Sequence, residues 1–325
     1  MGKTMRILIT GVTGFVGGYL VEQCHARYPQ AELFGLYNHR EPLEDFAAMK
    51  HVISLKADIT QEEDVRRVLA QAQPDIIFHL AAQSSVAASW SDPVRTLQVN
   101  TIGTLRLLEA VRQEHPLARV VLVGSGEEYG VVQPHENPIR EEYPLRPINP
   151  YAVSKATQGL YGYQYFVAFQ LSIIRVRSFN HFGPRQSDVF VLPGFARQIA
   201  LIEAGKAEPI VLVGNLQAKR DFSPVEDVVA AYLAVAEFGQ PGEVYNVGSG
   251  KARSIRGILD LLLSFAKTPI RVCEDPTRMR PVDIPILEAD ISRIQAHTAW
   301  KPTISFEDAL EQTLNYWRDV VATTI

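Results

Sequence analysis

The sequence predicts an α/β fold in which a doubly wound parallel sheet carries a smaller C-terminal substrate-binding lobe. Apolar runs of strand length at residues 5–10, 32–37, 52–56, 76–80, 119–123 and 171–176 mostly alternate with helical stretches. This alternation is typical of βαβ units. The first run also leads directly into a glycine-rich turn and a helical stretch that reaches residue 28. We place the sheet in residues 1–179, with later segments returning to it, and the lobe mainly in residues 180–325.

Composition and charge exclude several classes of protein. The chain has 325 residues and 46% hydrophobic composition, enough for a full core. Its net charge of −4 leaves no basic footprint for nucleic acid. The first ten residues lack the long apolar segment of a signal peptide, and no apolar stretch reaches membrane-spanning length. We therefore expect a cytoplasmic protein with no nucleic-acid or membrane partner. Neither cysteines nor histidines show metal-ligand spacing, so we expect no metal site.

The glycine-rich turn after the first strand predicts a dinucleotide site of the Rossmann type. Gly11 permits the tight turn, Gly14 lets a pyrophosphate approach the backbone, and Gly17 lets the helix pack on the strand. The N-terminus of the helix would face the anion. Thr13, Phe15 and Val16 belong to the same turn and complete the expected cradle.

The ends of the next strands supply the other expected cofactor contacts. Asp58 and Ile59 follow the third strand and Leu80, Ala81 and Ala82 the fourth, at the edge where such sheets bind ligands. Asp58 would face the adenine amino group, although a plain turn aspartate is an equally good interpretation.

The end of the second strand bears on cofactor choice. It ends in Leu36-Tyr-Asn-His-Arg40, without the carboxylate that would bind the ribose 2′-hydroxyl of NAD. Asn38 and Arg40 stand there instead, and an arginine suits a 2′-phosphate. This pattern favours NADP(H) and leaves NAD(H) open.

Tyr151 and Lys155 are the expected proton-transfer pair. Asn149 reads as a helix N-cap and Pro150 as the first helical residue, so the two side chains share one helix face. A neighbouring ammonium and the positive end of a helix both favour a phenolate. We therefore expect the pKa of Tyr151 to be shifted towards working pH.

Together these features resemble the extended short-chain dehydrogenase/reductases that act on nucleotide sugars. The resemblance rests on the glycine turn, Asp58-Ile59, Leu80-Ala-Ala-Gln83, Asn100, Ser125 before Tyr129-Gly130, and Tyr151 with Lys155. It implies that Ser125 polarises a carbonyl group and that Asn100, Tyr151 and Lys155 lie against the cofactor.

Four further strings look like the GDP-mannose branch of that family. They are Gly124-Ser-Gly-Glu-Glu-Tyr-Gly130, Ser178-Phe-Asn-His-Phe-Gly-Pro184, Val213-Gly-Asn-Leu216 with Arg220-Asp-Phe222, and Arg278-Met-Arg-Pro-Val-Asp283. This resemblance implies that NAD(P)H reduces the C4 ketone of GDP-4-keto-6-deoxy-D-mannose to GDP-D-rhamnose.

Three alternatives stay open. Glu127 stands where a 4,6-dehydratase of the branch carries its base, whereas Ser125 in place of Thr and residues 38–42 depart from that pattern. An epimerase fits less well because the second-strand acid is missing, and a dinucleotide sensor usually lacks the tyrosine or the lysine, which are both present.

The resemblance also suggests substrate contacts and an assembly. Asn180, Asn215, Arg220 and Arg280 are the expected nucleotide-sugar residues, together with Glu127, while Ser84 and Ser85 follow Ala82 and would reach the hexose. Helices at residues 92–113 and 150–170 carry broad apolar faces, which predict a homodimer but would equally suit a core.

Overall fold

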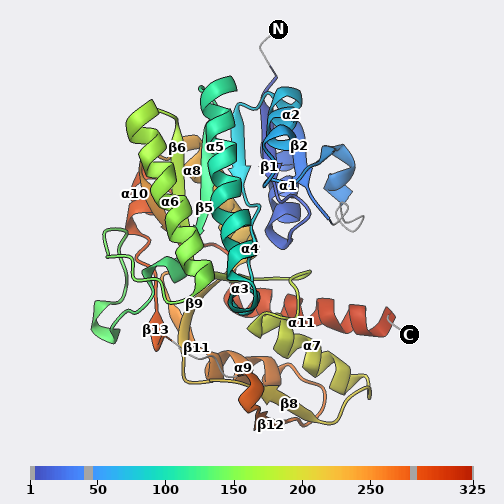
Figure 1. Cartoon of the computed structure of the whole chain (residues 1–325). Helices are drawn as coiled ribbons and strands as arrows, with labels where there is room; N and C mark the ends of the chain where they lie inside the picture. The colour runs from blue at the N-terminus through green and yellow to red at the C-terminus, as the bar shows by residue number, and fades with distance from the viewer. Residues whose placement is uncertain (1–3, 40–46, 279–283, 324–325) are drawn as a thin grey trace.

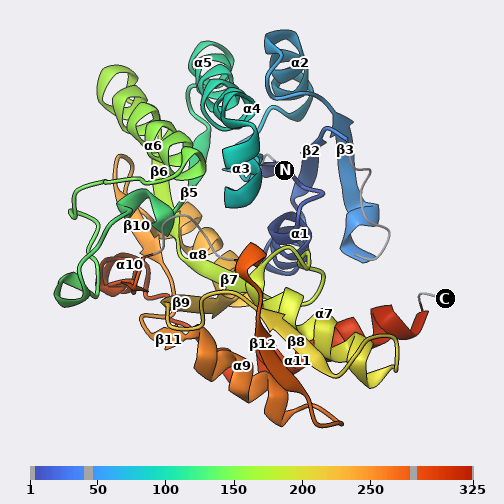
Figure 2. The same ribbon diagram turned by 60° about the horizontal axis from the view of Figure 1, so that its bottom comes forward.

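The computed structural model describes residues 4–39, 47–278 and 284–323. Its centre is a parallel seven-stranded sheet in the order β10-β6-β5-β4-β1-β2-β3, seen from two directions in Figures 1 and 2. The strands are β1 (Arg6–Thr10), β2 (Glu32–Tyr37), β3 (Val52–Lys56), β4 (Ile76–His79), β5 (Arg119–Ser125), β6 (Ile173–Ser178) and β10 (Val244–Val247). The predicted doubly wound sheet is confirmed, with β10 added from the second half of the chain.

Helices cover both faces of this sheet, as Figure 2 shows. One face packs on α2 (Glu62–Ala72), α5 (Gly103–Glu114) and α6 (Pro150–Phe169). The other packs on α1 (Phe15–Arg27), α8 (Val225–Phe238) and α10 (Ser292–Thr298). The central strands are therefore buried on both sides, as their continuous apolar runs predict.

The expected helix at residues 92–113 is divided into three consecutive pieces. They are α4 (Pro93–Leu97), a π-helical segment at Gln98–Ile102 and α5, and the short helix α3 (Val86–Ser91) precedes them. The π-helical segment inserts an extra residue into the turn, which changes the face that its side chains present.

Elements from the second half build a smaller body beside the carboxyl ends of the main strands (Figure 1). One small sheet joins β11 (Ala252–Ser254), β9 (Lys219–Pro224), β13 (Ile286–Leu287) and β7 (Asn180–Phe182), and another pairs β8 (Ile210–Val213) with β12 (Arg271–Glu274). Helices α7 (Val191–Glu203), α9 (Ile255–Ser264) and α11 (Phe306–Thr323) share a separate apolar core with them.

Short 3₁₀ segments complete the described chain, at η1 (Ala47–His51), η3 (Gly126–Tyr129), η4 (Pro134–Glu136) and η5 (Pro276–Arg278). Among the described helices, none is both long and apolar enough to cross a membrane.

Candidate active site

A cavity of about 950 Å³ lies where the carboxyl ends of the main strands meet the smaller body. Its walls come from the β1–α1 turn, the chain after β4, η3, the start of α6, and segments around α7 and β9. Parallel sheets bind ligands at this edge because loops from several strands converge there.

The glycine turn forms a cradle that side chains would fill. Gly11 has a φ of +72°, and a Cβ placed on it would lie 2.8 Å from the Ala81 nitrogen. A Cβ on Gly17 would lie 2.3 Å from the Val12 oxygen. Helix α1 begins after Gly14, whose lack of a side chain leaves the first N–H groups without a side-chain cap. This arrangement fits a pyrophosphate, and Thr13, Phe15 and Val16 line the same cavity.

The expected adenosine contacts lie apart from this cavity wall. Oδ1 of Asp58 accepts hydrogen bonds from the Thr60 nitrogen (2.8 Å) and hydroxyl (2.7 Å). Partial burial opposes ionisation, yet these bonds, Arg95 and Asn38 hold the pKa of Asp58 below its usual value. Asp58 is thus an ionised turn residue, while Ile59 is buried against Gly103. Arg40 lies outside the described residues, so its contact with a 2′-phosphate stays a prediction.

Asn100 supports the cavity wall from behind, whereas the resemblance had suggested contact with the cofactor. It is fully buried in the π-helical segment and does not line the cavity. Its amide accepts a hydrogen bond from the Gln83 nitrogen (2.7 Å) and donates to the Gln83 oxygen (3.1 Å) and the Ser154 hydroxyl (2.9 Å). Because these bonds join the chain after β4 to α6, the residue braces Ala81 and Ala82, which do line the cavity.

Helix α6 presents Tyr151 and Lys155 to the cavity, as predicted. Asn149 is the N-cap and accepts a hydrogen bond from the Ala152 nitrogen (2.8 Å), and Pro150 occupies the first turn. Lys155 is 3% exposed, and its Nζ donates to Oε1 of Gln158 at 2.8 Å.

The expected lowering of the Tyr151 pKa is wrong for the protein without ligands. Burial of the phenol raises its pKa above the usual value; the Ser125 hydroxyl lowers it, and Glu127 and Glu128 raise it further. Burial also lowers the pKa of Lys155 to about 8, against the opposing effect of Glu128. Desolvation is thus the largest influence on the phenol, and Tyr151 carries its proton near neutral pH.

Ser125 and Glu127 complete the reactive end of the cavity, which both line. Ser125 ends β5, and its Oγ accepts a hydrogen bond from the Glu127 nitrogen at 3.2 Å. Asn149 Nδ2 donates to Oε2 of Glu127 at 3.1 Å. The residue that caps α6 thus also fixes the carboxylate beside Tyr151.

The predicted substrate residues within the described chain all line the cavity: Ser84, Ser85, Asn180, Asn215 and Arg220. Ser85 also caps α3, accepting a hydrogen bond from the Ala88 nitrogen (3.2 Å). Arg220 is buried, with Nη1 donating to the oxygens of Lys219 (2.9 Å) and Ile284 (2.5 Å). Arg280 lies outside the described residues.

Sequence reasoning missed most of the apolar wall. The segment from Val189 to Phe195, at the start of α7, lines the cavity together with Leu212 and Leu216. Phe190 precedes α7 without a side-chain cap, and the first turn carries no acidic residue. Apolar side chains of this kind give no chemical signal in a sequence, because the same residues form ordinary cores.

Comparisons with known proteins agree with this geometry. The model of the GDP-mannose 4,6 dehydratase family matches residues 8–313. The chain is 34% identical to GDP-6-deoxy-D-mannose reductase of Pseudomonas aeruginosa, over 98% of this chain and 99% of that one. RMD from Pseudomonas aeruginosa complexed with NADPH superposes with a TM-score of 0.83 at 32% identity, over 97% of this chain and 100% of that one. UDP-glucose 4-epimerase of Thermus thermophilus in complex with NAD gives 0.86 at 30% identity, over 97% and 99%. The chain therefore belongs to the GDP-mannose 4,6-dehydratase family of extended short-chain dehydrogenase/reductases.

Proposed function

We propose that this protein reduces the C4 ketone of GDP-4-keto-6-deoxy-D-mannose to GDP-D-rhamnose with NAD(P)H. The observation that carries the proposal is that Tyr151, Ser125 and Lys155 line one cavity together, with the phenol buried. Reduction of a ketone needs a proton donor, which a neutral phenol provides. The 34% identity to a reductase named for GDP-6-deoxy-D-mannose supports the same substrate class.

Each residue of the site has a distinct part in this reaction. Bound NAD(P)H would supply the hydride that C4 receives. Tyr151 donates its phenolic proton to the oxygen that becomes a hydroxyl, and Ser125 donates a hydrogen bond to the same oxygen. A preorganised donor of this kind typically lowers a barrier by about 3 kcal/mol. Lys155 holds a positive charge beside the phenolate that Tyr151 leaves behind.

The glycine cradle would hold the cofactor by its pyrophosphate, with Leu80, Ala81 and Ala82 along its path. Solved relatives bind NADPH in one case and NAD in another. With no acid among the residues that end β2, we favour NADP(H) and keep NAD(H) as the second cofactor.

The nucleotide sugar would occupy the wall opposite the cradle. Asn180, Asn215 and Arg220 supply polar groups there, and the uncapped start of α7 adds the positive end of a helix. This arrangement suits a diphosphate, while Ser84 and Ser85 suit hexose hydroxyls. We accordingly propose residues 1–179 with β10 and its neighbours as the dinucleotide domain, and the remainder of 180–325 as the sugar-binding lobe.

Glu127 favours a second candidate, GDP-mannose 4,6-dehydratase. Its carboxylate lines the cavity next to Ser125 and is held by Asn149. A dehydratase needs a base at this position to remove the C5 proton.

We also propose a homodimer through the outer faces of α4 and α6. Val94 is 65% exposed on α4 and Leu160 is 59% exposed on α6, with Val153 and Val167 one heptad either side of Leu160. Leu160→Glu should convert the dimer to a monomer in analytical ultracentrifugation, because a charge would be buried between copies. Leu117→Glu, at a residue 95% exposed outside these helices, is the control and should remain dimeric. A monomeric native protein would contradict the assembly.

A paired assay tests the proposed function. GDP-4-keto-6-deoxy-D-mannose is supplied with NADPH or NADH, and GDP-mannose with NADP or NAD, while nicotinamide absorbance and the sugar product are followed. The proposal expects NAD(P)H oxidation and GDP-D-rhamnose from the keto-sugar only. Conversion of GDP-mannose to the keto-sugar without net cofactor turnover would instead establish the dehydratase.

A further inference from the structure

The second glutamate of the Glu127–Glu128 pair takes no part in the reaction described above, yet it is the more deeply buried of the two. Glu127 lines the large cavity, whereas Glu128 is 2% exposed and lies behind it. An ionised carboxylate at such a position is costly unless it is paired and hydrogen-bonded. Its partners therefore indicate what it stabilises.

The Glu128 carboxylate joins the catalytic strand to its neighbour. Oε1 accepts a hydrogen bond from the Ser125 backbone nitrogen at 2.7 Å, and Oε2 accepts one from Arg177 Nε at 3.0 Å. A Cβ on Gly124 would lie 2.2 Å from Oε1, and a Cβ on Gly159 would lie 3.8 Å from Oε2. Gly159 is one helical turn beyond Lys155, so the carboxylate sits between β5, β6 and the helix that carries Tyr151 and Lys155.

Arg177 is itself fixed from its other side, which prevents the pair from turning away. Its Nη1 donates to the Tyr129 hydroxyl (3.0 Å) and to the Glu141 oxygen (2.9 Å). The Tyr129 hydroxyl donates to Oδ1 of Asn246 (2.6 Å).

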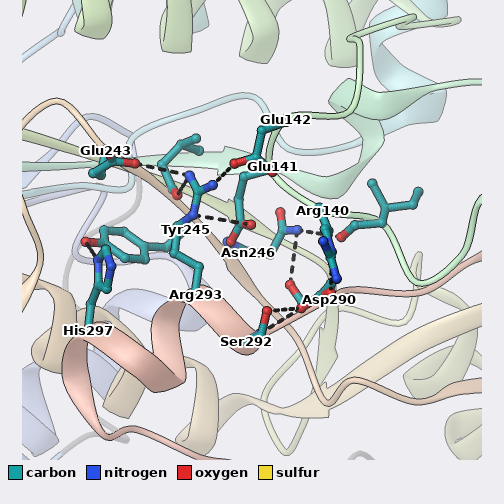
Figure 3. Close-up of polar contacts among 12 residues, drawn as sticks. Arg140, Glu141, Glu142, Glu243, Tyr245, Asn246, Asp290, Ser292, Arg293 and His297 are labelled. Carbon is teal, nitrogen blue, oxygen red and sulfur yellow. Dashed lines mark hydrogen bonds and ion pairs between the residues drawn. The ribbon is translucent and has the colours of Figure 1, made fainter.

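Figure 3 shows the outer end of this network, where Arg293 of α10 is directed towards Glu141, Glu142 and Glu243. The Asn246 nitrogen donates to Oε1 of Glu141 at 2.9 Å and so ties this surface cluster to the buried residues. The position of Glu128 is thus determined by contacts that extend to the protein surface.

The charge of Glu128 acts on both members of the proton-transfer pair. It raises the pKa of Tyr151 and the pKa of Lys155. The other charged or titratable groups around the pair are Glu127 of η3, Arg177 of β6 next to Glu128, His79 of β4 and Tyr232 of α8. His79 is buried between two threonine hydroxyls with its pKa lowered to about 3, so it is neutral.

We propose that Glu128 is a positioning residue: its Oε1 fixes the backbone of Ser125, and its carboxylate places a negative charge between β5, β6 and the helix that carries Tyr151 and Lys155. This inference rests on the proposed reductase function, because a reductase needs a phenol that carries its proton. Neither role requires Glu128 to touch substrate or cofactor.

Two variants separate the hydrogen bond from the charge. Glu128→Gln keeps an acceptor for the Ser125 nitrogen but removes the charge, so the pKa values of Tyr151 and Lys155 both fall. Lys155, with a pKa of about 8, loses its proton before Tyr151 does. Because kcat declines as Lys155 becomes neutral, the basic limb of the kcat–pH profile should move down by about one pH unit. Glu128→Asp keeps the charge but withdraws the carboxylate from Ser125. It should lower kcat about tenfold, as for a displaced hydrogen-bond partner, with the basic limb unmoved.

Glu141→Gln is the matched control, because the Glu141 side chain is 3% exposed, like that of Glu128, and belongs to the same network but contacts neither Ser125 nor α6. The basic limb of the kcat–pH profile of Glu141→Gln should not move. NADPH binding and thermal unfolding verify that each variant is folded. If Glu128→Gln does not fold, the kcat of Glu128→Asp tests the inference by itself.

Two outcomes overturn the inference: an unmoved basic limb in folded Glu128→Gln, or wild-type kcat in Glu128→Asp. If the proposed function itself is wrong, the native enzyme will not turn over the keto-sugar, which distinguishes that failure from failure of the inference.

Discussion

The two long walls of the cavity differ in how they are built. The wall for the cofactor comes mainly from backbone and small residues at the ends of β1 and β4, where geometry allows almost no other side chain. The opposite wall comes from side chains around the consecutive elements α7, β8 and β9, and is largely apolar. One wall therefore depends on backbone conformation and the other on side-chain shape, so the two walls should respond to mutation in different ways.

The largest expected effect lies where the walls meet. Tyr151→Phe removes the proton donor without changing the volume of the side chain, so kcat for the keto-sugar should fall about a thousandfold. NADPH binding, measured by fluorescence titration, should be retained. Tyr245→Phe is the control, because Tyr245 is buried in β10 and its hydroxyl contacts the Gln240 nitrogen and His297. Substantial turnover by Tyr151→Phe would refute the role of the phenol.

A single added methyl group in the cofactor wall should cause a large loss of stability and of cofactor binding. Gly11→Ala combines a positive φ with a Cβ 2.8 Å from the Ala81 nitrogen, and should lower stability by about 3 kcal/mol. It should also abolish measurable NADPH binding. Gly205→Ala shares the positive φ but has open space around the Cβ, so it should cost only about 1 kcal/mol. Equal losses in the two variants, measured by urea unfolding, would contradict the close approach at Ala81.

We expect the buried Lys155 to destabilise the protein when no cofactor is bound. Its burial lowers the pKa to about 8 from a usual value near 10.5, so below pH 8 the folded state disfavours a charge that the unfolded chain accepts freely. The folded state binds fewer protons between pH 8 and 10.5, and stability from this group therefore rises with pH across that window.

Lys155→Met should accordingly be inactive but about 2 kcal/mol more stable at pH 7, after allowance for the lost bond to Gln158. Urea unfolding without cofactor should show this advantage disappearing above pH 10.5. An advantage that persists at high pH would mean that packing, not charge, explains it.

Truncating one side chain in the opposite wall, around α7, β8 and β9, should weaken substrate binding only moderately. Phe190→Ala removes part of the apolar surface at the start of α7 and should raise the KM for the nucleotide sugar about tenfold, with kcat within about twofold. NADPH affinity should be unchanged. Leu117→Ala, distant from the cavity wall, serves as the control. A loss of NADPH affinity in Phe190→Ala would show that the two walls are not independent.

The same difference explains what could be predicted from the sequence. The strands, the glycine turn and the Tyr151–Lys155 pair follow from local rules, since periodicity, a cap and residue spacing specify them. The pKa of Tyr151 could not be predicted, because its burial depends on β5, β6 and α8 packing around it. The roles of Asn100 and Glu128 also depend on partners far away, Ser154 and Arg177, that no local pattern reveals.

In the proposed reaction, C4 receives a hydride from NAD(P)H and the new hydroxyl receives a proton from Tyr151. The most direct measurement incubates the native enzyme with GDP-4-keto-6-deoxy-D-mannose and NADPH deuterated at the transferred position of nicotinamide C4, and locates the label by NMR. Deuterium at C4 of GDP-D-rhamnose, with labelling about a thousandfold slower in Tyr151→Phe, is the predicted result. A sugar product without deuterium at C4, or a product formed only from GDP-mannose, would contradict the account.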